Sequence, residues 1–195
     1  MTNHSEYKIV ISPVGNVDKA VIKPIAKEIV RVFGFKTDVT PILDDVDFAL
    51  NASRDQYHST QILERLDSLA PPDAIKLLAI TDVDLFIPIL TYVYGEAQLG
   101  GRACIISTHR LNDGIGSITP EAYHFRIAKE AIHELGHTFK LRHCPDHTCI
   151  MHYCRSVDDV DRKSNQLCRY CTVLLEDEKN RLREPDMAKG LQLNR

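Results

Sequence analysis

Residues 131–143 read AIHELGHTFKLRH, a run that places three histidines and one glutamate at the spacing of a catalytic zinc site. On a helix with 3.6 residues per turn, His133 and His137 lie one turn apart on one face, so their imidazole nitrogens can bind one ion about 2.0–2.1 Å away. His143 can supply a third nitrogen only if the helix ends first, because a continuous helix would carry it to the far side. We therefore predict a bend near Lys140.

The same run indicates the chemistry of hydrolysis. Three neutral imidazoles leave the fourth zinc position open to water, and Glu134, beside a ligand but not itself a ligand, can take that water's proton. The alternative is a solvated helix with an accidental histidine pair, but the flanking residues are largely apolar and buried imidazoles need partners. These apolar residues are Ile127, Ala128, Ala131, Ile132, Leu135 and Phe139.

Four cysteines follow in the pattern C-x4-C, a gap, then C-x2-C, and they are Cys144, Cys149, Cys168 and Cys171. Two cysteine pairs at this spacing favour a closed, structural zinc site made of four thiolates. Disulfide bonds are the alternative, because the six cysteines are an even number. The first residues, MTNHSEYK, contain no apolar signal segment, so we expect a cytoplasmic protein in which zinc is favoured over disulfides.

The remaining cysteines and two further histidines have simpler interpretations. Cys154 lies five residues after Cys149 and is an alternative ligand of the cysteine site. Cys104 stands in the apolar run 103–106 and is expected to be a buried core residue. His147 and His152 are expected to lie at the surface.

With these motifs in view, the chain resembles the archaemetzincins, a branch of the metzincin zinc peptidases. The metzincin pattern H-E-x-x-H-x-x-G-x-x-H and its later turn methionine fall on His133, Glu134, His137, His143 and Met151. Archaemetzincins add a cysteine after the third histidine, then C-x4-C-x-M and a closing C-x-x-C, which fall on Cys144, Cys149, Met151, Cys168 and Cys171. The motif-bearing segment runs from about residue 133 to residue 171, and the first half resembles the family only in the order of its elements.

The resemblance implies a zinc-dependent metallopeptidase with two zinc ions per chain, one catalytic on the three histidines and one structural on the four cysteines. It also implies that Met151 forms a hydrophobic floor beneath the imidazoles. Tyr153 resembles the tyrosine that approaches the zinc in astacin-like and serralysin-like metzincins. Its phenol would donate a hydrogen bond to the developing oxyanion, and the alternative is a tyrosine packed under the active-site floor.

One position departs from the family pattern, because Lys140 stands where the metzincins have glycine. A lysine held at positive φ costs roughly 1 kcal/mol. Lys140 could instead keep its backbone in another region, or aim its ammonium toward the cleft, or have no effect. An ammonium aimed toward the cleft would interfere with catalysis. The alternative function is therefore that of a catalytically weak or inactive metzincin-fold protein with a peptide-binding or regulatory role. A third alternative is an interaction module in which only the cysteine zinc site matters.

Length and charge exclude several classes of protein. The 195 residues are enough for one compact domain, divided at about residue 143 into an N-terminal subdomain with the sheet and a C-terminal subdomain with the cysteines. The net charge of −3 comes without a basic stripe, so nucleic acid is not expected as a partner. The apolar stretches are too short to span a membrane. A monomer is expected.

The order of the predicted elements favours an α/β (α+β) fold. The expected strands are 7–14, 35–42, 76–81, 92–98 and 103–107, and the expected helices are 17–33, 55–69, 120–140 and a terminal helix within 156–183. Thr119 is the expected N-cap of the third helix. The last dozen residues are expected to fray. This order predicts a mixed twisted sheet, parallel except for an edge strand, in a metzincin-like fold.

The edge strand is the expected site of substrate binding. In the family, the antiparallel edge lines the cleft, so residues 92–98 are expected to border the groove. A peptide or protein substrate would add itself there as one more strand, through backbone bonds that read little sequence. Gly100 and Gly101 are expected to form a hairpin turn after this strand.

Overall fold

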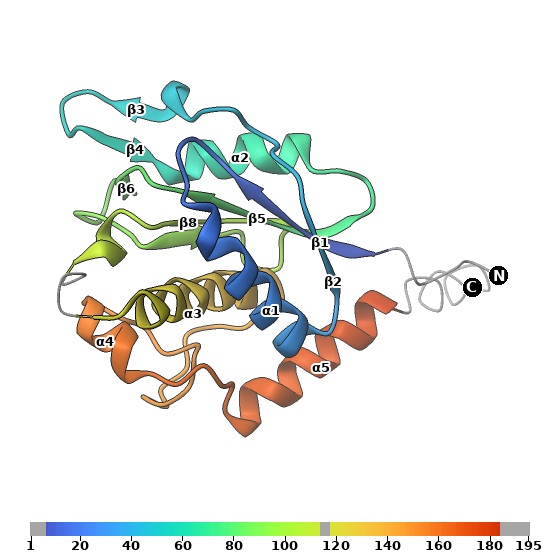
Figure 1. Cartoon of the computed structure of the whole chain (residues 1–195). Helices are drawn as coiled ribbons and strands as arrows, with labels where there is room; N and C mark the ends of the chain where they lie inside the picture. Colours follow the sequence, from blue (N-terminus) through green and yellow to red (C-terminus); the bar gives the residue numbers. More distant parts are fainter. Residues whose placement is uncertain (1–6, 114–117, 184–195) are drawn as a thin grey trace.

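Helices cover both faces of a five-stranded twisted sheet in the computed structural model, which describes residues 7–113 and 118–183 (Figure 1). In sheet order the strands are β2 (Lys36–Val39), β1 (Lys8–Pro13), β5 (Ala74–Thr81), β8 (Ala103–Ser107) and β7 (Gly95–Ala97). The first four are parallel, and β7 pairs antiparallel with β8 at the edge. The predicted mixed sheet with an antiparallel edge strand is confirmed.

A second, smaller sheet was not predicted. Its strands are β3 (Leu50–Asn51), β4 (Gln56–His58) and β6 (Leu85–Phe86). Strands of two or three residues show no readable alternation of apolar and polar side chains, so the sequence carries no signal for them. Because β4 occupies the start of the predicted helix 55–69, the observed helix begins at Ser59.

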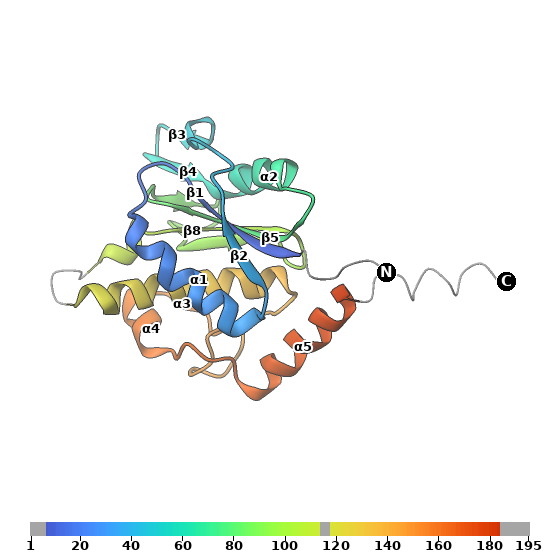
Figure 2. The same ribbon diagram turned by 45° about the vertical axis from the view of Figure 1, so that its right-hand side comes forward.

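The helices lie on both sides of the five-stranded sheet. They are η1 (Lys19–Val21), α1 (Ile22–Phe33), η2 (Asp47–Ala49), α2 (Ser59–Leu69), η3 (Arg110–Asn112), α3 (Pro120–Thr138), α4 (Val157–Arg162) and α5 (Arg169–Arg183). Helix α2 covers one face of the sheet, whereas α1 and α3 cover the other, and α4 and α5 lie beyond α3 (Figure 2). Helix α3 therefore lies between the sheet and the C-terminal segment.

Alternation along the central strands creates a core on each face of the sheet. Ile9 and Ile11 of β1 pack on the side of α1 and α3, whereas Val10 packs on the side of α2. Cys104 of β8 is fully buried on the first side, as expected. The first cluster continues beyond α3 to Leu175 of α5, so the sheet and the C-terminal segment share one apolar core.

Buried cations on α3 hold the C-terminal segment in place. The Lys129 ammonium donates to the carbonyl oxygens of Val160 and Asp161, each at 2.9 Å, and so caps the C-terminal end of α4. Arg126 is 2% exposed and pairs with the Asp161 carboxylate at 2.7 Å. These contacts fix the chain that follows Met151 against α3.

Within residues 7–113 and 118–183, every helix is too short or too polar to cross a membrane. The N-cap prediction for α3 is confirmed, since the Thr119 hydroxyl accepts from the Ala122 N–H at 3.2 Å. The expected fraying of the last dozen residues lies outside the described residues.

Candidate metal centre and catalytic cleft

Helix α3 carries the first two histidines of the motif, and their Nε2 atoms face each other. The Nε2 atoms of His133 and His137 lie 3.2 Å apart. The Nδ1 atom of His133 lies 2.9 Å from the Ile150 carbonyl oxygen, and that of His137 lies 2.7 Å from the Leu141 carbonyl oxygen. A carbonyl oxygen only accepts, so both Nδ1 atoms carry the proton. The two facing Nε2 atoms then both hold lone pairs, which repel unless a cation lies between them.

The third histidine reaches the same point because the chain reverses at Lys140. Helix α3 ends at Thr138, and Lys140 takes the left-handed conformation with a φ of 64°. The Lys140 N–H donates to the His137 carbonyl at 2.9 Å and the Leu141 N–H to the Gly136 carbonyl at 3.0 Å, which is a Schellman motif. The bend predicted near Lys140 is confirmed.

The three imidazoles form a set that suits a zinc ion. One potential ligand nitrogen from each of His133, His137 and His143 lies within 4.8 Å of the others. Burial lowers the pKa of all three imidazoles, most strongly that of His133, and so favours the neutral form that a metal ligand needs. The donor set and the orphaned lone pairs therefore fit the predicted metal.

Glu134 lies beside this set in a buried position. Its side chain lines a cleft of about 390 Å³, which is also lined by the three histidines and strand β7. Burial raises the pKa of the Glu134 carboxyl well above its usual value, and the neighbouring Glu130 carboxylate adds to the shift while the Lys163 ammonium opposes it. A cation at the imidazoles would act in the same direction as Lys163.

Strand β7 crosses directly over Glu134, a contact that the sequence analysis missed. A Cβ atom added to Gly95 would lie 2.7 Å from Cγ of Glu134 and 2.6 Å from the Ile105 carbonyl oxygen. Gly95 thus permits the edge strand to approach the carboxylate. A glycine within a predicted strand can mark such a close approach, so Gly95 is the sequence signal from which this contact could have been predicted.

We expect Gly95→Ala to lower kcat/KM for the predicted peptide cleavage by about 100-fold, because the new methyl group must displace Glu134 or β7 by about 1 Å. Steady-state kinetics on the folded, zinc-loaded variant would measure this. Gly101→Ala is the matched control, since its Cβ would meet the Gln98 side chain at 2.5 Å, away from the carboxylate. An equal loss of kcat/KM in both variants would assign the effect to general destabilisation.

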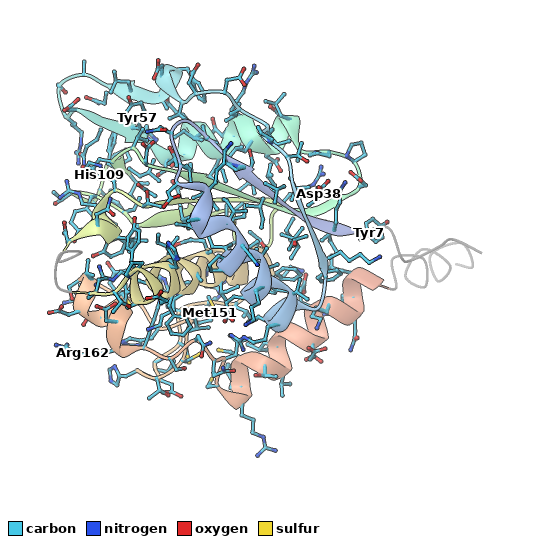
Figure 3. All side chains as sticks on the ribbon, viewed as in Figure 1. Tyr7, Asp38, Tyr57, His109, Met151 and Arg162 are labelled. Atoms are coloured by element: carbon cyan, nitrogen blue, oxygen red, sulfur yellow. The ribbon has the colours of Figure 1, made fainter. Side chains whose placement is uncertain are left out.

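Met151 supports α3 from the side that faces away from the sheet (Figure 3). It is fully buried, and a Cβ atom added to Gly136 would lie 2.5 Å from its sulfur. The glycine between Leu135 and His137 therefore lets the helix rest on the methionine. A glycine inside a predicted helix indicates a close packing contact, so the sequence itself carries a signal for this contact.

Tyr153 lines the cleft beside the third histidine. Its ring centroid lies 5.1 Å from that of His143, and the side chain is 44% exposed. It is therefore not packed under the floor, which was the alternative interpretation. The phenol remains accessible to a molecule in the cleft.

Lys140 points away from the cleft. Its ammonium lies 2.8 Å from the Glu178 carboxylate of α5, and its stem packs on Gly100, where an added Cβ would lie 2.9 Å from the lysine Cγ. Both predicted alternatives for this residue, a backbone outside the left-handed region and an ammonium in the cleft, are wrong. The ion pair with α5 accounts for the orientation.

The four motif cysteines also converge. The sulfur atoms of Cys144, Cys149, Cys168 and Cys171 all lie within 4.8 Å of one another. Cys144 and Cys168 are 3.7 Å apart at sulfur, far beyond a disulfide bond of about 2.05 Å, and all four are free thiols. The Cys171 N–H lowers the pKa of Cys168 by donating to its sulfur. These features suit a tetrahedral thiolate site.

Cys154 does not join this group. It lines the same cleft as Glu134, and burial raises the pKa of its thiol to about 11. The interpretation of Cys154 as an alternative ligand of the cysteine site is therefore wrong, because the chain turns toward the cleft after Met151.

Comparison with known proteins gives one consistent result. A model of Peptidase family M54 matches residues 43–177. The archaemetzincin of Methanocaldococcus jannaschii is 37% identical over 172 residues, which cover 87% of this chain and 93% of that protein. The archaemetzincin of Methanopyrus kandleri is 41% identical over 130 residues, which cover 67% of this chain and 71% of that protein.

Solved structures resemble the chain along most of its length. The crystal structure of the Methanopyrus kandleri archaemetzincin has a TM-score of 0.80 at 30% identity and covers 93% of this chain and 100% of its own. A zinc-dependent peptidase from Methanocorpusculum labreanum has a TM-score of 0.77 at 28% identity, with coverage of 86% and 99%.

Proposed function

Because the chain belongs to peptidase family M54, the archaemetzincins, and is a zinc metallopeptidase, we propose that it hydrolyses peptide bonds with Glu134 as the general base. One observation carries this proposal. The Nε2 atoms of His133 and His137 face each other at 3.2 Å while their Nδ1 protons are committed to backbone carbonyls, beside the buried Glu134 carboxyl.

Two zinc ions per chain follow from the two donor sets. His133, His137 and His143 would hold the catalytic ion, and the four motif cysteines would hold a structural one. When bound, the catalytic ion supplies Lewis-acid polarisation of the scissile carbonyl and lowers the pKa of a water molecule to about 7.

Glu134 moves the proton in this reaction. Its carboxylate takes a proton from the attacking water as the new carbon–oxygen bond forms. The same carboxyl returns the proton to the leaving nitrogen as the carbon–nitrogen bond breaks. The cleft restricts solvent around Glu134, which is 7% exposed, so the proton remains available for the second step.

The edge strand would bind the substrate backbone. The Tyr94 carbonyl accepts from Ser107 and the Gln98 N–H donates to Ala103, so these residues direct their backbone groups toward β8. By alternation, Gly95 and Ala97 direct theirs toward the cleft that they line. An extended peptide can add itself antiparallel or parallel to this edge.

Tyr153 would assist at the oxyanion. Its side chain lines the cleft, and its ring centroid lies 5.1 Å from that of His143. A donor placed at the developing oxyanion typically contributes about 100-fold in rate.

A peptide-library digest would test the proposed function. We expect cleavage at defined sites, loss of cleavage with a zinc chelator, and recovery when zinc is returned. The library should contain unmodified peptides and be analysed by mass spectrometry, so that no cleavage preference is assumed. Absence of zinc-dependent products from a fully loaded protein would contradict the proposal.

The alternative of a weak or inactive peptide-binding protein rests on Lys140. That residue pairs with Glu178 and is not among the described residues that line the cleft. No specific observation therefore favours the alternative over catalysis.

We expect Lys140→Gly to leave kcat/KM within about twofold and stability within about 1 kcal/mol, because relief of the positive-φ strain offsets the lost ion pair. Lys140→Met is the matched control, since it keeps the strained backbone and loses the charge, and it should be the less stable variant. Peptide kinetics and chemical denaturation would measure both. A large rise in kcat/KM for Lys140→Gly would show that the lysine suppresses catalysis.

A further inference from the structure

A pair of histidines outside the cleft has the geometry of a metal site. His147 and His152 lie on either side of the turn that carries Cys149 and Met151. The Nδ1 atom of His147 lies 3.1 Å from the Nε2 atom of His152. Their ring centroids are 4.5 Å apart and the ring planes meet at 68°.

The two motif histidines on α3 provide an internal comparison. His133 and His137 have nitrogens 3.2 Å apart, ring centroids 4.7 Å apart and ring planes at 90°. Two nitrogens that share a tetrahedral ion at about 2.0–2.1 Å lie about 3.3 Å from each other. The outer pair, His147 and His152, therefore matches the catalytic pair in separation and in its edge-to-face arrangement.

The protonation of His152 suits a ligand. Its Nδ1 atom lies 2.9 Å from the Cys144 carbonyl oxygen, so Nδ1 carries the proton and Nε2 holds the lone pair that faces His147. Metal-ligating histidines almost always donate their other N–H in this way. His147 is exposed, so its own proton can reside on either nitrogen at little cost.

We propose that His147 and His152 together bind a late first-row divalent metal ion such as Zn²⁺. Imidazole nitrogens suit this class of ion. Among the described residues, no third histidine, cysteine, aspartate or glutamate completes a cluster with this pair within 4.8 Å. Water fills the remaining positions, and the affinity is lower than that of the three-histidine and four-cysteine sets.

The bound ion would brace the turn that supports both proposed zinc sites. The Cys144 N–H donates to the Met151 carbonyl and the His152 N–H to the Cys149 carbonyl, each at 2.9 Å. A link between residues 147 and 152 closes the same turn through side chains. An ion that binds only the folded chain stabilises it by mass action.

Equilibrium dialysis of the zinc-loaded protein against buffered free Zn²⁺, followed by metal analysis, would test the proposal. We expect the wild-type protein to bind one more ion per chain than His147→Ala. His152→Gln should behave as His147→Ala does, because its amide can still donate to the Cys144 carbonyl but offers no imidazole lone pair. The same extra ion should raise the thermal unfolding midpoint of the wild type only.

His109→Ala is the matched control, since His109 is exposed and has no histidine partner in the described structure, and it should bind as many ions as the wild type. Equal ion counts in the wild type and His147→Ala would overturn the proposal, as would loss of the ion in His109→Ala. The readout is a difference between variants, so it does not depend on whether the protein cleaves peptides.

Discussion

Replacing Glu134 by alanine is expected to lower peptide cleavage by about 10²- to 10⁴-fold, the range typical of a lost general base. The carboxyl is 7% exposed and lies under Gly95. The two other carboxylates that line the cleft have partners of their own, since Glu130 pairs with the Lys163 ammonium at 2.6 Å and Glu96 accepts from the Ser59 and Thr60 hydroxyls. The corresponding loss of transition-state stabilisation is about 3–5 kcal/mol.

Zinc should remain bound in this variant. The imidazoles of His133 and His137 are oriented by the Ile150 and Leu141 carbonyls and not by Glu134. Kinetics combined with metal analysis would separate the two effects. Glu121→Ala, an exposed glutamate in the first turn of the same helix, is the control and should keep full activity. Cleavage by Glu134→Ala at the native rate would remove the assignment.

Replacing Cys149 by serine is expected to remove the proposed structural zinc and to destabilise the fold by more than about 4 kcal/mol, at the extreme end for single substitutions. The energy of a structural zinc site is folding energy, because the unfolded chain does not preform it. Cys149 is 1% exposed, and its sulfur accepts from the Cys168 N–H at 3.3 Å. A serine there removes one thiolate and leaves a cavity.

Catalysis should be lost with the zinc, since Cys144 directly follows His143 and Met151 lies two residues after Cys149. Zinc content and urea denaturation under reducing conditions would measure the effect. Cys154→Ser is the matched control, because Cys154 lies outside the cysteine cluster, and it should keep both ions. An unchanged zinc content in Cys149→Ser would contradict a structural site on these cysteines.

Local patterns predicted the elements of this fold that depend on neighbouring residues. The three-histidine run, the bend at Lys140 and the N-cap at Thr119 are each contained within about three helical turns. The order of the predicted strands and helices likewise predicted a mixed sheet with an antiparallel edge strand. Spacing along the chain is enough for these features because the helix and the strand have fixed periods.

Contacts between distant segments could not be predicted in this way. Gly95 lies against Glu134, which is 39 positions later in the chain, and Lys140 pairs with Glu178, which is 38 positions later. The departure of Cys154 from the cysteine cluster is decided by the turn after Met151. No periodic pattern in the sequence predicts any of these contacts.

The sequence by itself therefore determined which side chains form the two proposed metal-binding sets, because their spacing on regular elements and short loops limits where they can point. Only the tertiary structure decided what surrounds those sets: an edge strand over the carboxylate, a lysine turned toward α5, and a second histidine pair beside the turn. These arrangements depend on how separate elements pack, and packing is selected by the shape and burial of the whole core and not by any local run of residues.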